Sequence, residues 1–160
     1  KLQVENKKIL FSFLPDNKIP VIQADPKLLR IVVQNILSNA VKYTPIGGKI
    51  TVSIARAKKN TVLLKIADTG YGIPKNQQQK IFTKLFRADN VRDKDTDGTG
   101  LGLYIVKSIV ENSGGEIRFS SPGGSALGGE SSKNPGTTFY VTLPILGAKK
   151  NEGENASTLS

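Results

Sequence analysis

A carboxylate followed by two closely spaced glycines forms the most chemically informative turn in the sequence. Asp68 follows an apolar run over residues 61–67 that is typical of a buried β-strand, and Gly70 and Gly72 come after it at alternate positions. Glycine has no Cβ, so the chain can bend there and another molecule can approach the backbone closely. A carboxylate at such a turn can accept hydrogen bonds from a ligand, although Asp and Gly are also ordinary turn residues.

A second group of polar side chains follows a helical repeat. Asn35, Asn39 and Lys42 stand at positions i, i+4 and i+7 of a segment whose apolar residues also recur at helical spacing. At about 100° per residue the three side chains fall within an arc of about 60°, beside the apolar stripe. Amide oxygens suit a magnesium ion that keeps several waters, and an ammonium group suits phosphate. The alternative is that the three side chains only hydrogen-bond a neighbouring loop.

A glycine-rich turn at residues 98–103 runs directly into a second helix that extends to Ser113. Such a turn leaves free N–H groups at the positive end of the helix dipole, which is a favourable place for phosphate. The turn lacks the Gly-Lys-Ser/Thr ending of a P-loop and the βαβ context of a dinucleotide fold. A flexible junction is the alternative interpretation.

The remaining segments supply the elements that must position these groups. Asp25 and Pro26 are typical of a helix start, and Pro45 predicts the end of that helix near Tyr43 and Thr44. Strands are expected at residues 8–14, 49–57, 61–67, 116–120 and 137–143. This order predicts an α+β fold, a two-layer α/β sandwich with a mixed, mostly antiparallel five-stranded sheet and about three helices on one face.

Three segments are expected to lie outside this framework. Residues 75–99 contain a short amphipathic piece over residues 79–86 and then a highly charged stretch, and are predicted to form a mobile lid, with a disordered linker as the alternative. Residues 122–136 are rich in Gly and Ser and are typical of a surface loop. The first 146 residues are therefore predicted to be one domain, and residues 147–160 a disordered tail.

The composition excludes several classes of function. The 160 residues contain no Cys and no His, which removes thiolate and histidine metal sites and a Ser-His-Asp triad. No apolar run approaches the roughly 18–20 residues that span a bilayer. The net charge is +10, but the basic residues are scattered and Trp is absent, so nucleic acid is a weak alternative. Since Met is also absent, we expect the chain to be a fragment of a longer protein.

Taken together, these segments resemble the catalytic and ATP-binding domain of bacterial sensor histidine kinases, in the gyrase, chaperone, histidine kinase and mismatch-repair ATPase superfamily. Five family boxes occur in the family's order, at residues 34–45, 68–73, 81–87, 98–103 and 136–139. The resemblance implies the Bergerat ATP-binding fold with a mobile ATP lid, and ATP and Mg²⁺ as ligands.

The resemblance also implies a role for each site residue. Asn39 would coordinate Mg²⁺ with support from Asn35, Lys42 would meet the phosphates, and Arg87 on the lid would reach the γ-phosphate and its developing charge. The backbone of Gly98, Thr99, Gly100, Leu101, Gly102 and Leu103 would hold phosphates. The adenine pocket would comprise Tyr43, Asp68 as acceptor for the amino group, Gly70, Gly72, Ile73 and Thr138.

Within this superfamily, one position distinguishes the kinases from the ATPases. Gyrase-type ATPases carry a water-activating glutamate four residues before the magnesium asparagine, whereas this chain has Asn35 there, which cannot accept a proton near neutral pH. The resemblance therefore implies a protein-histidine kinase that keeps its ATP for a histidine on a separate dimerisation domain, with a response regulator as the next partner. The fragment is expected to be cytoplasmic, without membrane or nucleic-acid contact, and monomeric when isolated.

Two further alternatives remain at this point. One is a serine kinase of the anti-sigma-factor type, from the same superfamily; the long match at residues 34–45 and the apolar cluster of Phe82, Leu85 and Phe86 argue against it. The other is a nucleotide-sensing module without transfer activity, against which all five boxes look intact.

Overall fold

A five-stranded mixed sheet with helices on one face forms the framework of the chain. The computed structural model describes residues 6–58, 60–86, 88, 99–122 and 135–146. The strands are β1 (Leu10–Pro15), β2 (Lys49–Ala57), β3 (Thr61–Asp68), β4 (Glu116–Ser120) and β5 (Thr137–Pro144), in the spatial order β1-β2-β3-β5-β4. β1 is parallel to β2 and every other neighbouring pair is antiparallel. The predicted α+β sandwich with a mostly antiparallel sheet is confirmed.

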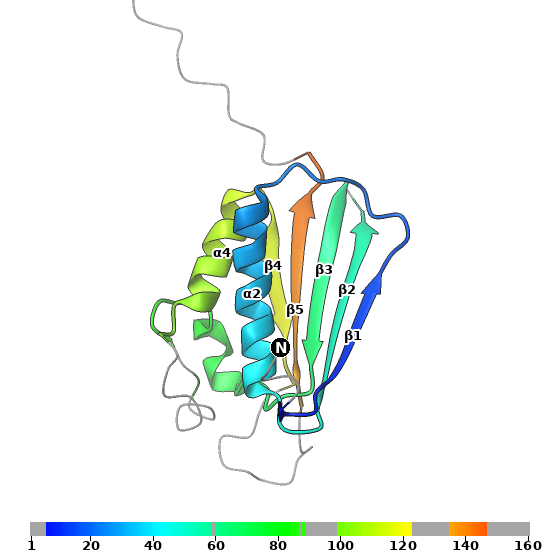
Figure 1. Ribbon diagram of the computed structural model, residues 1–160. Helices are drawn as coiled ribbons and strands as arrows, with labels where there is room; N and C mark the ends of the chain where they lie inside the picture. The colour runs from blue at the N-terminus through cyan, green and yellow to red at the C-terminus, as the bar shows by residue number, and fades with distance from the viewer. Residues whose placement is uncertain (1–5, 59, 87, 89–98, 123–134, 147–160) are drawn as a thin grey trace, which may run out of the picture.

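Two α-helices lie side by side against the sheet, α2 (Pro26–Tyr43) and α4 (Gly102–Asn112) (Figure 1). The bounds of α2 follow local sequence signals. The side chain of Asp25 accepts a hydrogen bond from the N–H of Lys27 at 2.7 Å, and Thr44 leaves the helix in an extended conformation before Pro45. The predicted start and end of this helix are therefore confirmed.

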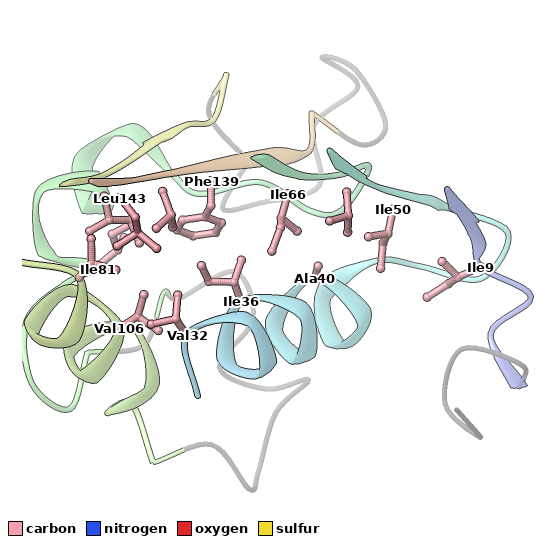
Figure 2. Close-up of a cluster of buried hydrophobic side chains, with 14 residues drawn as sticks. Ile9, Val32, Ile36, Ala40, Ile50, Ile66, Ile81, Val106, Phe139 and Leu143 are labelled. Atoms are coloured by element: carbon pink, nitrogen blue, oxygen red, sulfur yellow. The ribbon is translucent and has the colours of Figure 1, made fainter. Parts of the chain in front are cut away.

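The core lies between the helices and the sheet. Val32, Ile36 and Ala40 form the buried stripe of α2, and Val106 and Val110 form that of α4. Figure 2 shows Ile36 and Ala40 facing Ile66 and Ile50 of the central strands. Alternate residues of β2, β3 and β5 supply the other side of this layer, which fixes the register of the strands because a shift by one residue would expose them.

The register places Asp68 at the end of β3, the central strand of the sheet. β3 pairs with β2 on one side and with β5 on the other, and Asp68 lies opposite both Ile50 and Thr137. The predicted strand ended at Ala67, one residue short, and the antiparallel hairpin of β2 and β3 is confirmed. The strand end therefore brings Asp68 to the layer between sheet and helices.

Two expectations differ in detail from the structure. The first strand begins at Leu10 rather than at residue 8, because Lys8 has a φ of 49° and cannot continue an extended strand. The amphipathic piece expected over residues 79–86 is instead a 3₁₀ helix at Lys75–Lys80 followed by turns, and Leu85 has a φ of 60°.

Several expectations fall on parts of the chain for which only the ends are described, or nothing at all. Of the predicted lid, residues 75–86, 88 and 99 are described, and of the predicted loop at 122–136 only the two ends. The predicted tail at 147–160 lies outside the described residues. Within the described ranges no helix combines the length and the hydropathy needed to cross a bilayer.

Candidate functional site

A cavity of about 340 Å³ lies between α2, the start of α4 and the ends of β3 and β5. It gathers most of the site residues expected from the sequence. Those in its lining are Asn35, Asn39, Lys42, Tyr43, Asp68, Gly72, Ile73, Thr99, Gly100, Gly102 and Leu103. Three separate segments thus meet at one volume, as the sequence patterns predicted. That volume is at the lower end of the range typical of small-molecule sites.

Asp68 is the partly buried carboxylate of this cavity. Its Oδ1 accepts hydrogen bonds from the N–H of Gly70 at 2.8 Å and from the N–H of Thr137 at 3.1 Å. Burial raises the pKa of Asp68 to about 6, and the two N–H donors oppose that shift. Among the described residues none donates to the other oxygen, Oδ2, so this atom can accept a hydrogen bond from a ligand.

Gly70 allows the turn after Asp68 to close against α2. A Cβ added at Gly70 would lie 2.7 Å from Oδ1 of Asp68 and 2.7 Å from the carbonyl oxygen of Tyr43. The N–H of Tyr71 donates to that same carbonyl at 3.2 Å. Gly70 is absent from the cavity lining, and its contribution is to let the strand end and the helix end approach each other.

The polar edge of α2 faces the start of α4. Nδ2 of Asn35 donates to the carbonyl of Ile31 at 2.9 Å, and a Cβ added at Gly102 would lie 2.7 Å from Oδ1 of Asn35. A side chain at position 102 would therefore require the end of the Asn35 side chain, or the helix start, to move. Nζ of Lys42 lies 5.9 Å from the ring centroid of Tyr43, so the cation and the ring flank the same end of the cavity.

The start of α4 offers backbone donors. Gly100 has a φ of 69°, which glycine adopts without strain, and the helix begins at Gly102. Within the described part of the chain no side chain caps this helix start. The first N–H groups of a helix have no intrahelical acceptor, so those of α4 are available to an anion in the cavity.

Besides Gly70, four expected site residues are not among those that line the cavity. Leu101 precedes the helix but is absent from the lining. Thr138 is also absent, and Thr137 lines the cavity in its place, because β5 alternates and turns Thr137 and Phe139 toward the helices. Gly98 and Arg87 lie outside the described residues, so their expected roles stay predictions.

The sequence analysis missed the network that holds Ile73. The N–H of Ile73 donates to Oγ of Ser121 at 2.8 Å, and Nε2 of Gln78 donates to the carbonyl of Ile73 at 3.0 Å and to that of Ser121 at 2.9 Å. Oγ of Ser121 donates in turn to the carbonyl of Gly136 at 3.0 Å. These bonds join segments that are far apart in the sequence, and no local motif predicts them. The other lining residues that were missed are Ser38, Ala40, Ile81, Phe86, Ala88, Thr137 and Phe139.

A partly buried carboxylate, an amide- and lysine-bearing helix edge and an uncapped helix start surround one cavity of the two-layer sandwich, an arrangement that suits a ligand with a hydrogen-bond donor at one end and negative charge at the other. The chain belongs to the histidine kinase-, DNA gyrase B- and HSP90-like ATPase family, whose sequence profile matches residues 24–147. The resemblance noted from the five boxes is thereby confirmed.

Sensor kinases are among the proteins most similar to this chain. Adaptive-response sensory kinase SasA of Rippkaea orientalis is 40% identical over 127 residues, which are 79% of this chain and 29% of that protein. Sensor histidine kinase Hik2 of Synechocystis sp. is 44% identical over 128 residues, 77% of this chain and 29% of that protein. The chain thus spans less than a third of either relative.

A solved structure supports the same family assignment. The mycobacterial sensor histidine kinase MprB superposes with a TM-score of 0.74 at 29% sequence identity, over 92% of this chain and 91% of that one. The sheet and the helices described above are therefore those of a histidine kinase catalytic domain.

Proposed function

We propose that this chain is the catalytic domain of a sensor histidine kinase, which binds ATP with Mg²⁺ and presents the γ-phosphate to a histidine on a separate dimerisation domain. The observation that carries the proposal is the convergence of Asn39, Lys42, Asp68 and the start of α4 on one cavity. The family supports ATP as the ligand, and the chemistry of these groups supports their division between the base and the phosphates.

The base end of the site is assigned to Asp68. The amino group of adenine is a donor, so it requires an acceptor, and a carboxylate whose Oδ1 already accepts two N–H groups has only acceptor capacity left at Oδ2. Gly72 and Ile73 line the same region, and Gly70 lets it close. Thr137, rather than the expected Thr138, is the threonine that faces this part of the cavity.

The phosphate end is assigned to α2 and α4. Mg²⁺ prefers oxygen ligands and keeps several waters, so phosphate oxygens, waters and an amide oxygen of α2 would suit it here. Asn39 is the proposed ligand. Oδ1 of Asn35 is turned toward Gly102, which suits a supporting role beside the metal. Lys42 and the N–H groups of α4 would neutralise the phosphates, and Arg87 remains proposed for the γ-phosphate.

The proposed reaction ends on another domain. The chain has no histidine, and Asn35 cannot act as a general base toward water, so the residues here bind and orient ATP without hydrolysing it rapidly. The histidine nucleophile, the response regulator that receives the phosphate and the cytoplasmic location are proposed for the longer protein.

The test measures binding and transfer separately. We expect ATP to bind more tightly with Mg²⁺ than without it, and Asn39→Ala to abolish that difference, whereas Asn112→Ala at the exposed end of α4 should not. A separate protein carrying the histidine helix should then acquire label from γ-labelled ATP. Label on a serine would support the serine-kinase alternative, and ATP binding without transfer to any acceptor would support the sensing module.

A further inference from the structure

The strand β1 forms one edge of the sheet and carries exposed apolar side chains on both of its faces. Leu10, Phe11, Phe13 and Leu14 are 65%, 51%, 57% and 58% exposed. Figure 1 shows β1 as the outermost strand, next to β2 and away from both helices. Four large apolar side chains on a six-residue edge strand are unusual, because folded proteins usually protect such edges from pairing with other chains.

The outer edge of β1 also offers backbone hydrogen bonds. The N–H of Leu10 donates to Gly48 and the N–H of Asp16 donates to Ile54, so the even-numbered residues direct their backbone groups toward β2. Successive residues of a strand point these groups in opposite directions. Phe11 and Phe13 therefore direct their N–H and C=O groups outward.

Five of the six residues of this strand read the same in both directions. Residues 10–14 read Leu-Phe-Ser-Phe-Leu, with Ser12 at the centre. We propose that β1 pairs antiparallel with β1 of a second copy of this chain, about a two-fold axis at Ser12. Phe11 then lies opposite Phe13 of the second copy and forms a hydrogen-bonded pair with it, through the same outward N–H and C=O groups.

This register also satisfies the side chains on each face. Phe11 and Phe13 share the helix side of the sheet with Ile50 and Val52, so the aromatic pairs extend the core layer across the axis. Leu10 lies opposite Leu14 of the second copy on the open side of the sheet. The pairing joins the two sheets into one continuous sheet, with no edge left at β1.

Charge at the two ends of the strand favours the same partner. Lys8 and Asp16 are both exposed and flank the strand on either side of Ser12, so the two-fold axis brings the Lys8 end of one copy near the Asp16 end of the other. Two chains of net charge +10 would otherwise repel each other. An arbitrary extended peptide would provide neither this charge pair nor the matched Phe and Leu rows.

The interface is small, so the association should be weak. One pair of short strands falls below the roughly 1,200 Å² of a stable interface. We therefore expect the 160-residue chain to be largely monomeric when dilute and to dimerise as its concentration rises, which departs from the monomer expected from the sequence. Two copies held in one assembly would meet at a much higher effective concentration.

Sedimentation velocity over a range up to about 1 mM, where weak pairs become populated, tests the association. Phe13→Asp should raise the dimer dissociation constant by about tenfold or more, because it removes both aromatic pairs and places a charge on each side of the axis. Val21→Asp is the matched control: Val21 is 92% exposed but lies outside the strand, so the substitution should have no effect. Sedimentation as a monomer at every concentration would overturn the proposal.

The register is tested with charge reversal and with a single introduced thiol. Lys8→Asp and Asp16→Lys should each weaken dimerisation, and the two combined should restore it, because the reversed pair is again complementary. In Ser12→Cys the Cα atoms across the axis would be about 4.5 Å apart, within disulfide range. It should form disulfide dimers about tenfold faster than Val21→Cys, because pairing raises the effective concentration. Equal rates for the two thiols, or no restoration by the combined charge reversal, would overturn this register.

Discussion

Oδ1 of Asp68 accepts a hydrogen bond from the N–H of Thr137 at 3.1 Å, which ties the partly buried carboxylate of the cavity to the first residue of β5. The two residues are also partners in the sheet register. Because the same oxygen accepts the N–H of Gly70, one atom holds together the end of β3, the turn after it and the start of β5. The carboxylate therefore shapes this end of the cavity as well as offering an acceptor to a ligand.

We expect Asp68→Asn to weaken ATP binding by about 10- to 100-fold, the range for losing a hydrogen bond to a charged acceptor. The amide oxygen can still accept the N–H groups of Gly70 and Thr137, so the fold should be nearly unchanged. The amide nitrogen, however, is a donor and would face the donor group of adenine. Isothermal titration with ATP measures the affinity.

The control for this variant is Asp16→Asn, which changes the same side chain at an exposed position outside the cavity. It should bind ATP as tightly as the unmodified chain. If Asp68→Asn also bound ATP with unchanged affinity, Asp68 could not be the group that accepts from the base.

The partial burial of Asp68 also makes the free energy of unfolding depend on pH. Burial raises the pKa of Asp68 from 3.8 to about 6, so the folded chain binds this proton more tightly than the unfolded chain does. The resulting stabilisation is fully present below pH 3.8 and is lost as pH rises through about 6. A shift of this size corresponds to about 3 kcal/mol, an order-of-magnitude figure.

Urea unfolding of the unmodified chain and of Asp68→Asn between pH 4 and pH 8 measures this dependence of stability on pH. The free energy of unfolding of the unmodified chain should fall relative to that of the variant, which has no proton to lose at this position, as pH rises from 4 to 7. A difference between the two proteins that stays constant over this range would show that the pKa of Asp68 is not raised in the folded state.

The parts of the site that could be predicted from the sequence are those set by local chemistry. Asp25, Pro26 and Pro45 determine the bounds of α2, and within it the i, i+4, i+7 spacing determines that Asn35 and Asn39 share an edge with Lys42. A glycine before a helix is likewise a local signal. Each of these features depends on residues within one or two turns of each other.

The parts that were missed depend on pairing between distant segments. Thr137 and Thr138 are equivalent as residue types, and only the alternation of β5 against β3 decides which of them faces the cavity. The bonds from Ile73 to Ser121 join segments 48 residues apart, and no local pattern distinguishes Ser121 from the serine before it. Such contacts become visible only when the register of the whole sheet is known.

Lys7 is expected to stabilise the end of α2 that carries the site. Its Nζ donates to the carbonyls of Val41 at 2.9 Å, Lys42 at 2.7 Å and Thr44 at 3.1 Å, at the negative end of the helix dipole. We expect Lys7→Met to lower the free energy of unfolding by about 1–3 kcal/mol, because the carbonyls lose a charged donor. Chemical denaturation measures the change.

The neighbouring Lys8 provides the matched control, since it is exposed and carries the same charge. Lys8→Met should change stability by less than about 0.5 kcal/mol, as surface substitutions usually do. Equal losses for the two variants would mean that the net charge, and not the contact with the helix end, is responsible.

Asn35 of α2 lies against Gly102 at the start of α4, and a double-mutant cycle can measure the coupling between these two positions. In Gly102→Ala the new Cβ would lie 2.7 Å from Oδ1 of Asn35, so either the helix start or the amide must move. We expect a loss of about 1 kcal/mol in the free energy of unfolding, at the low end for overpacked positions, because the new methyl group meets the end of a side chain. Combining Gly102→Ala with Asn35→Ala should recover much of this loss, because the truncated side chain no longer reaches the methyl group. A coupling of less than about 0.5 kcal/mol between the two substitutions would mean that the helix start moves freely away from α2 and that Asn35 does not position it.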